Sequence, residues 1–253
     1  MRNTELFRML EIPDEVEKQL INYGKSRNIS IPNIIINKIL KRDEWDVGIQ
    51  ELQELLEDDS DGIKILWELL NIISNYSYEE YTKRNISNDI FIATMKFCTR
   101  FLHEYHQTFQ TYKFVWGWWF PRQISLNEYR IGALEYEFVD AENREIAVHI
   151  PSDADLRKRS VAQSIKDFNE FRVKHYPGWK TVKLTSDTWM LMPELKEMLG
   201  KESNILAFQN LFEIDTVDHD ATWYMGWIFP GIETVDEQLP EKTSLQRKIK
   251  EYL

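Results

Sequence analysis

Apolar side chains recur every three or four residues through the first hundred positions, the spacing that places them on one face of an α-helix. Polar residues and a proline suited to begin helices stand ahead of these stretches: Asp14, Pro32, Asp43, Asp61 and Ser87. The stretch after Ser87 runs to Phe109 and is the longest. We predict an all-helical half whose apolar faces form a packed core.

The pattern changes after Gln110. An aromatic run at 114–120 is followed by two stretches typical of β-strands, at 129–138 and 144–150, and then by a capped loop and a helix that ends near Pro177. Further expected elements are a strand at 181–185, short helices at 193–199 and 203–208, a second hairpin pairing 212–217 with 222–229, and a last helix opened by the capping box Thr243–Gln246. We therefore predict an α+β protein, with an all-helical domain over residues 1–110 and a mixed β-sheet domain with flanking helices over residues 111–253.

The alternation within 129–138 changes phase near Gly132. Polar residues occupy even positions up to Arg130 and odd positions at Glu135 and Glu137. Because the side chains of one strand alternate strictly between two faces, a slip of one residue indicates a β-bulge at Gly132. The alternative is that the two residues after Gly132 are both simply buried, and the sequence favours neither explanation.

Charge and cysteine content narrow the classes of function. The net charge of -11 and the pI near 5.1 disfavour a nucleic-acid partner, because affinity for phosphate backbones comes from clustered Lys and Arg. Cys98 is the only cysteine, which excludes an intrachain disulfide, and the pair His103 and His106 lacks further ligands, so no metal is expected. The first residues lack the apolar core and the cleavage site of a signal peptide, so none is expected, and the sequence has no apolar run of the roughly 18 residues that a membrane span needs. We expect a cytoplasmic protein without membrane contact.

Five motifs follow one another along the chain. They are Trp118–Gln123, Tyr129–Glu137, His149–Leu156, Ser203–Ile205 and Thr243–Arg247. Together they resemble a family of bacterial acyltransferases that join an N-acyltransferase N-terminal domain to a GNAT-like C-terminal domain. The resemblance covers nearly the whole chain and implies a sheet in which two central strands splay apart to admit an acyl thioester.

In such a fold the pyrophosphate of acyl-CoA binds to backbone amides where the long helix begins. The resemblance maps this role onto the loop 151–157 and the start of the helix, with Ser152, Asp153, Ala154, Arg157 and Lys158 as contacting residues. The loop lacks the glycines usual in GNAT enzymes, and its aspartates compete with a phosphate for the helix start. Acyl-CoA is thus the expected cosubstrate, with no permanently bound cofactor.

Transfer of an acyl group to an amine needs a base that removes the proton of the amine. The candidates are Glu135, Glu137 and His149. A solvated strand face is the alternative for the two glutamates, and a structural role is the alternative for His149. Arg122 and Arg130 can clamp an anionic group of the substrate or, as we favour, neutralise the glutamates.

The tryptophans Trp118, Trp119 and Trp189 can form the floor of an acceptor pocket, although tryptophan is more often buried in the core.

The sequence and the resemblance together suggest two functions. The first is an N-acyltransferase that acts on an amine-bearing small molecule or peptide. The second is a noncatalytic GNAT-like module that binds another ligand or a protein, and the acidic, glycine-free loop favours it.

Overall fold

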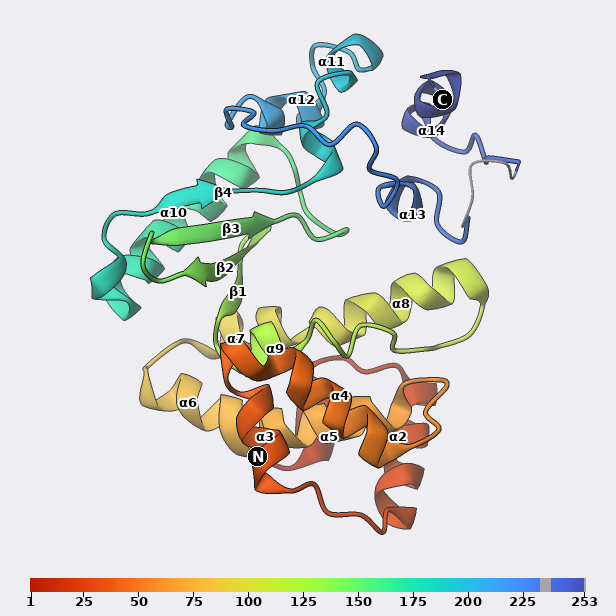
Figure 1. The fold of residues 1–253 in the computed structure, drawn as a ribbon, viewed down its shortest axis with the longest axis vertical. Coiled ribbons are helices and arrows are strands. Elements are labelled where there is room, and N and C mark those ends of the chain that lie inside the picture. The colour runs from red at the N-terminus through yellow and green to blue at the C-terminus, as the bar shows by residue number, and fades with distance from the viewer. Residues whose placement is uncertain (233–237, 253) are drawn as a thin grey trace.

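The computed structural model describes residues 1–232 and 238–252, and a helical half and a half built on a small sheet are apparent in Figure 1. The helical half contains α1 (Asn3–Met9), α2 (Asp14–Ser26), α3 (Asn33–Ile39), the 3-10 turn η1 (Arg42–Glu44), α4 (Trp45–Leu56), α5 (Ile63–Ile72), the π-helical turn η2 (Ile73–Ser77), α6 (Tyr78–Lys83), α7 (Asn88–Met95), α8 (Phe97–Phe109) and α9 (Pro121–Ile124). The second half contains β1 (Glu128–Ile131), β2 (Leu134–Asp140), β3 (Glu145–His149), α10 (Lys158–His175), η3 (Pro177–Trp179), β4 (Lys183–Thr185), η4 (Trp189–Leu191), α11 (Leu195–Met198), α12 (Asn204–Gln209), α13 (Met225–Ile228) and α14 (Ser244–Tyr252).

The helices of the first half follow the expected pattern with one interruption. α2 begins at Asp14, and the Ser87 side chain caps α7 by accepting a hydrogen bond from the Ile90 N–H. The single helix expected after Ser87 is broken at Lys96, where ψ is -2°, and becomes α7 and α8. This break matters for the site, because α8 and α7 contact different parts of the sheet half.

The stretch expected as one strand at 129–138 is instead a hairpin. β1 ends at Ile131, β2 begins at Leu134, and Gly132 and Ala133 form the turn between them. Gly132 has a φ of +63° at the first turn position, where glycine is favoured in two-residue hairpins. The expected bulge is therefore wrong: the polar residues change phase because the chain reverses. Ala133 and Leu134 are both buried, as the alternative required, but not within one regular strand.

The sheet is mixed, as predicted, with the order β1-β2-β3-β4. The first three strands are antiparallel, and β4 pairs with β3 in parallel. The apolar face of the sheet packs on α10, where the rings of Tyr136 and Phe168 stack with centroids 3.9 Å apart. The β3 and β4 strands pair at three positions only, the last being Ala147 with Thr185. The His149 end of β3 therefore extends past its ladder with β4.

A continuous hydrophobic core joins the two halves. It contains Leu66 and Phe97 from the helical half together with Tyr136 and Phe168 from the sheet half. Helix α7 also lies along β1, where the Thr94 hydroxyl accepts the backbone N–H of Arg130 at 3.0 Å. None of the helices in the described ranges has both the length and the apolar character required to cross a membrane.

The second hairpin expected at 212–217 and 222–229 is wrong. The segment after Gln209 runs without strands as far as the short helix α13. Ile214 and Val217 remain 38% exposed, so the alternation that suggested a strand buries no face. Met225, Ile228 and Phe229 instead pack with residues of α11 and α14 in a smaller second core.

The last helix begins as predicted. The Thr243 hydroxyl accepts the Gln246 N–H, and the Gln246 side chain accepts the Thr243 N–H, each at 3.1 Å, which completes the capping box.

Candidate active site

The polar face of the sheet is turned toward the helical half. The strand register pairs Glu128 with Glu137, Arg130 with Glu135, and Glu135 with His149, so these side chains share one face. Glu135 and Glu137 are only 5% and 4% exposed. The expectation of a solvated strand face is therefore wrong, because residues of the first half cover these carboxylates.

A hydrogen-bonded pair of His149 and Glu137 lies on this face. The His149 Nε2 atom is 3.0 Å from Glu137 Oε2, and Arg122 and Arg42 approach Glu137 Oε1 at 3.4 and 3.6 Å. Burial acts to raise the pKa of Glu137, but the hydrogen bond from His149 and the charge of Arg122 outweigh it and lower that pKa. Burial acts to lower the pKa of His149, yet the Glu137 hydrogen bond and the charge of Glu128 raise it above its ordinary value.

Glu128 belongs to the same cluster, although the sequence pattern did not single it out. Its side chain is fully buried and accepts hydrogen bonds from Trp119 Nε1 at 3.1 Å and from Gln123 Nε2 at 2.8 Å. Burial raises the pKa of Glu128 to about 7. The Gly132 turn was the missing signal, because only a hairpin places Glu128 opposite Glu137.

These acids and the imidazole are close enough to raise the question of a metal. A ligand atom from each of Glu128, Glu137 and His149 lies within 4.8 Å of the others. Arg122 and Arg42 already supply positive charge to Glu137, and a cation between the three groups would be repelled by these guanidinium groups. The residues therefore fit an ion-pair network better than a metal site.

Glu135 is held by two arginines. Arg100 of α8 donates to both of its carboxylate oxygens, at 2.9 and 3.3 Å, and Arg130 lies 3.9 Å from one of them. Together with the contact between Arg122 and Glu137, this is the neutralising arrangement favoured from the sequence. Arg130 also donates to Asp153 at 2.9 Å, which ties the β1 strand to the loop after β3.

Within the loop 151–157 the two aspartates have arginine partners. Asp155 accepts the N–H of Arg157 and pairs with its guanidinium at 2.6 Å, while Asp153 is directed to Arg130. The Ser160 hydroxyl also donates to Asp155, at 2.5 Å. The charge that competes with a phosphate is thus partly neutralised inside the loop.

The other candidate loop residues lie at the start of α10. Ala154 donates its N–H to the Pro151 carbonyl at 2.9 Å, and Ser152 donates to Glu104 of α8. Lys158 is the first residue of α10. Among the hydrogen bonds of the described residues, none uses the backbone N–H of Lys158 or of Arg159, so two donors at the helix start remain available to an anion. A cavity of about 580 Å³ lies against this loop and reaches Arg130 and Arg159.

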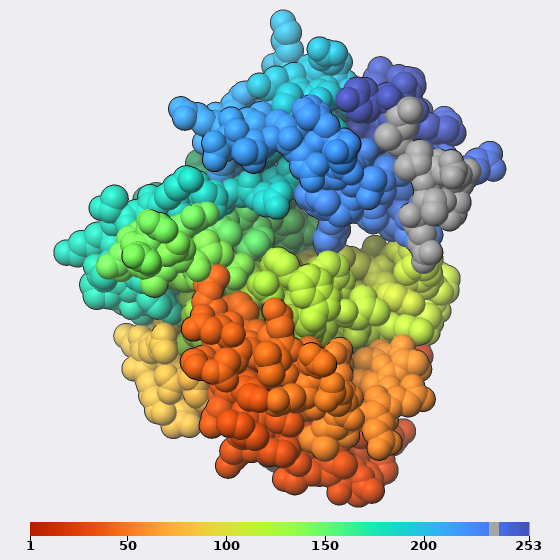
Figure 2. Space-filling model, viewed as in Figure 1, coloured from red at the N-terminus to blue at the C-terminus, as the bar shows by residue number. Residues whose placement is uncertain are grey.

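A larger cleft of about 1430 Å³ opens between α8 and residues 223–231, and the loop 151–157 contributes to its wall. It lies in the hollow between the yellow-green helix and the blue segment in Figure 2. One part of its wall is polar and includes Arg100, Arg130 and Asp153. Another part is aromatic and is formed by Phe101, Phe109, Trp116, Trp223 and Trp227.

Tryptophan rings connect His149 with the aromatic part of the cleft. Trp119 meets His149 edge to face at 5.3 Å, Trp118 lies 5.3 Å from Trp119, and Trp116 stacks on Trp118 at 5.5 Å and approaches Trp227 at 5.7 Å. Trp118 is 47% exposed, whereas the indole N–H of Trp119 is used by Glu128. Trp189 is not part of this series and packs against the second core.

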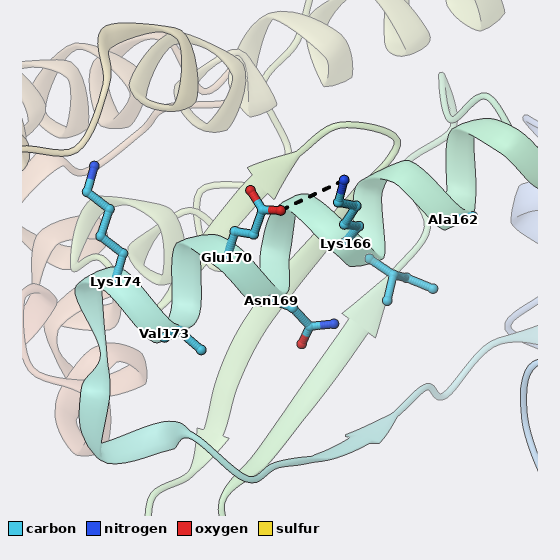
Figure 3. A pocket seen from close by; sticks show the side chains of 7 residues that line it. Ala162, Lys166, Asn169, Glu170, Val173 and Lys174 are labelled. Carbon is cyan, nitrogen blue, oxygen red and sulfur yellow. Dashed lines mark ion pairs between the residues drawn. The ribbon is translucent and has the colours of Figure 1, made fainter.

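A separate shallow groove runs along α10, with the exposed side chains Lys166, Glu170 and Val173 on its wall (Figure 3). Its one ion pair among the residues drawn joins Lys166 and Glu170 at 4.0 Å on consecutive turns. Helix α10 covers the apolar face of the sheet, so this groove is separated from His149 by the sheet itself. We assign no chemistry to it.

Two family models match adjacent parts of the chain and together cover nearly all of it. The model of an N-acyltransferase N-terminal domain matches residues 1–126, and that of a GNAT-like C-terminal domain matches residues 128–253. No curated protein matches the chain in sequence.

Several solved acyltransferase structures share the fold, among them three complexes. They are an acyltransferase in complex with decanoyl-CoA and teicoplanin (TM-score 0.78, 16% identity), a tryptophan-to-alanine acyltransferase mutant in complex with octanoyl-CoA (0.76, 15%), and an acyltransferase in complex with CoA and 10C-teicoplanin (0.76, 16%). Each comparison covers 98% of this chain and 82% of the other.

Proposed function

Because the chain belongs to the family that joins an N-acyltransferase N-terminal domain to a GNAT-like C-terminal domain, we propose that it transfers an acyl group from acyl-CoA to an amine. The observation that carries this proposal is the His149 and Glu137 pair at the end of β3, just beyond the last β3–β4 pair and close in sequence to the loop that precedes α10. An imidazole oriented by a carboxylate is a common form of general base.

The chemistry follows from the hydrogen bond to Glu137. When Nε2 carries the proton that is shared with Glu137, the Nδ1 atom of His149 holds the free lone pair. The amine nitrogen attacks the thioester carbonyl, its proton passes to Nδ1, and the C–S bond breaks. The departing thiolate takes that proton from the imidazolium, so the products are an amide and free CoA.

The position of the cosubstrate is supported by two adjacent cavities that share Arg130, Gly132 and Asp153. The free N–H groups at the start of α10 suit the pyrophosphate, with Arg157 and Lys158 as charged neighbours. The aromatic part of the large cleft suits an apolar acyl chain. We therefore propose acyl chains of about the length that the similar structures hold, octanoyl and decanoyl.

The acceptor is proposed only as a class: a small molecule or peptide that carries a free amine. Trp118, half exposed next to Trp119, offers it an aromatic surface. The alternative function is a noncatalytic module that keeps this fold. The ion pair of Asp155 with Arg157 favours that alternative, because it occupies a guanidinium that a phosphate would use.

Binding and turnover separate the two functions. We expect calorimetric titration to detect octanoyl-CoA and decanoyl-CoA binding, and to find weaker binding of acetyl-CoA, because the short chain leaves the aromatic wall uncovered. Release of CoA thiol should then be measured with amino sugars, short peptides and simple primary amines. His149→Asn should retain binding and lose turnover by at least about a hundredfold.

The matched control is His219→Asn, a histidine whose side chain is 73% exposed in the segment before α13. It should leave both binding and turnover unchanged. Absence of binding to every acyl-CoA would reject the acyl-CoA proposal. Binding without thiol release from any amine would favour the noncatalytic module.

A further inference from the structure

Two carboxylates lie beside His149, and they differ in their surroundings. Glu137 contacts His149 and has two arginines on its other oxygen. Glu128, directly opposite on β1, receives only the neutral donors of Trp119 and Gln123. In the described part of the chain, no cation lies within ion-pairing distance of Glu128.

Because Glu128 has no arginine partner among the described residues, its ionisation depends on whether a positive charge forms next to it. A fully buried carboxylate without a paired cation is costly, so its negative charge is sustained chiefly when a positive charge forms nearby. The imidazolium of His149 is the group that forms such a charge during amine deprotonation. The imidazolium can interact with Glu128 directly, because one polar atom each of Glu128, Glu137 and His149 lie within 4.8 Å of one another.

We propose that Glu128 is a positioning residue for the base, acting through His149 and Trp119 without contacting the substrate. The inference rests on the proposed function of His149. Glu128 would stabilise the imidazolium once it forms, and it would hold Trp119, whose ring borders His149 edge to face at 5.3 Å. Arg122 completes the support, with its guanidinium 3.9 Å above the Trp119 ring.

The sign of the effect is fixed by the charges around the imidazole. The titratable and charged groups around His149 and Glu128 are Glu135 and Glu137 from β2 and Arg122 from α9. Arg42 from η1 adjoins Glu137 on its other side. The negative charge of Glu128 raises the pKa of His149, so its removal lowers that pKa. The ascending limb of the rate profile, which follows deprotonation of the base, should then move to lower pH.

Glu128→Gln is the test, with Glu145→Gln as the matched control. Glu145 starts β3, accepts a hydrogen bond from Thr185 and lies outside the cluster, so the control removes one carboxylate charge from the same sheet. NMR titration of the His149 imidazole, assigned by its loss in His149→Asn, should show a lower pKa in Glu128→Gln than in the wild type. The turnover number should fall about tenfold or more with KM for decanoyl-CoA nearly unchanged, and the control should resemble the wild type.

Two further measurements cover the case in which Glu128→Gln does not fold. In the wild type, the His149 signals should titrate in two steps, because the imidazole and Glu128 are coupled. The double variant Gln123→Glu with Glu128→Gln exchanges the two side chains and keeps one carboxylate near His149. Its His149 pKa should therefore lie between that of Glu128→Gln and that of the wild type. A single ordinary titration step, or a folded Glu128→Gln protein with an unmoved His149 pKa, would overturn the role of Glu128. Absence of turnover in the wild type would instead reject the transferase function. The NMR titration needs no turnover, so it tests the interaction of Glu128 with His149 separately.

Discussion

Gly132 fixes the hairpin that brings the acids of β1 and β2 face to face. Its φ of +63° is a conformation that residues with a Cβ adopt at a cost, and an added Cβ would lie 3.1 Å from Ser164 Cβ. Ser164 has little freedom to move, because its hydroxyl bonds to Ile131, Leu134 and Tyr136. The turn is therefore closely fitted to α10.

We expect Gly132→Ala to lower the free energy of unfolding by about 1–3 kcal/mol. Urea denaturation followed by circular dichroism measures this change. Gly200→Ala is the control, since Gly200 does not have a positive φ and a Cβ added there would have no neighbouring atom within 4 Å, so its effect should stay within about 0.5 kcal/mol. Equal stabilities of the two variants would contradict the close fit at Gly132.

Individual residues show what the sequence could and could not provide. Alternation was enough to put Glu135 and Glu137 on one side of a strand and to draw attention to His149. It could not reveal their burial, because the covering residues Arg100 and Arg122 come from helices distant along the chain or too short to show a periodic pattern. Glu128 was not predicted for a related reason: the sequence pattern predicts one continuous strand where the structure has a two-residue turn.

Among the elements, the loop 151–157 with the start of α10 has the most direct effect on ligand affinity. Asp153 is 61% exposed, and it is paired with Arg130 at 2.9 Å and approached by Arg100 at 3.9 Å. Burial acts to raise the pKa of Asp153, but the hydrogen bond and charge of Arg130 outweigh it, and the pKa is lowered. Asp153 is therefore negatively charged at neutral pH and repels a phosphate beside the same arginine.

We expect Asp153→Asn to bind decanoyl-CoA about two- to fivefold more tightly, because it removes the repulsion and releases Arg130. The gain should shrink at high salt, since the affected charges are partly exposed. Glu15→Gln on α2, at the far end of the molecule in Figure 1, removes the same charge and should leave the affinity unchanged. Weaker binding by Asp153→Asn would show that the loop needs this carboxylate for its shape.

At the level of elements, the long periodic segments were predictable, and several short ones were as well. The strand expected at 181–185 and the short helices expected at 193–199 and 203–208 appear as β4, α11 and α12. The helix at Asp14, the helix start at Ser87 and the long helix α10 followed from spacing and capping chemistry, whereas the break at Lys96 did not. The expected hairpin at 212–229 failed because alternation by itself does not supply a sheet edge to pair with. Its apolar residues found the second core through the i, i+3 and i+4 spacing of Met225, Ile228 and Phe229.

For the whole molecule, the two halves depend on each other. The helical half supplies Arg100 to Glu135 and Arg42 to Glu137, while the hydrophobic core runs through both. A sheet half on its own would expose an apolar surface and leave buried carboxylates without their cations. The domain boundary predicted at residue 110 thus divides the chain by composition and does not imply separate folding.

We expect urea to unfold the protein in a single cooperative transition. Far-UV circular dichroism reports mainly the helices, and tryptophan fluorescence reports on side chains in both halves, such as Trp67 in α5 and Trp179 in η3, so the two curves should coincide. Two separated transitions would show that the halves are stable independently.

The contact between α7 and β1 also bears on how the protein behaves in concentrated solution. An edge strand usually presents unpaired backbone groups on which another chain can build by β-addition, the first step of many aggregates. Here one edge of the sheet has the Arg130 N–H occupied by Thr94, and the opposite edge, β4, is only three residues long. The fold therefore offers little template for strand-by-strand growth.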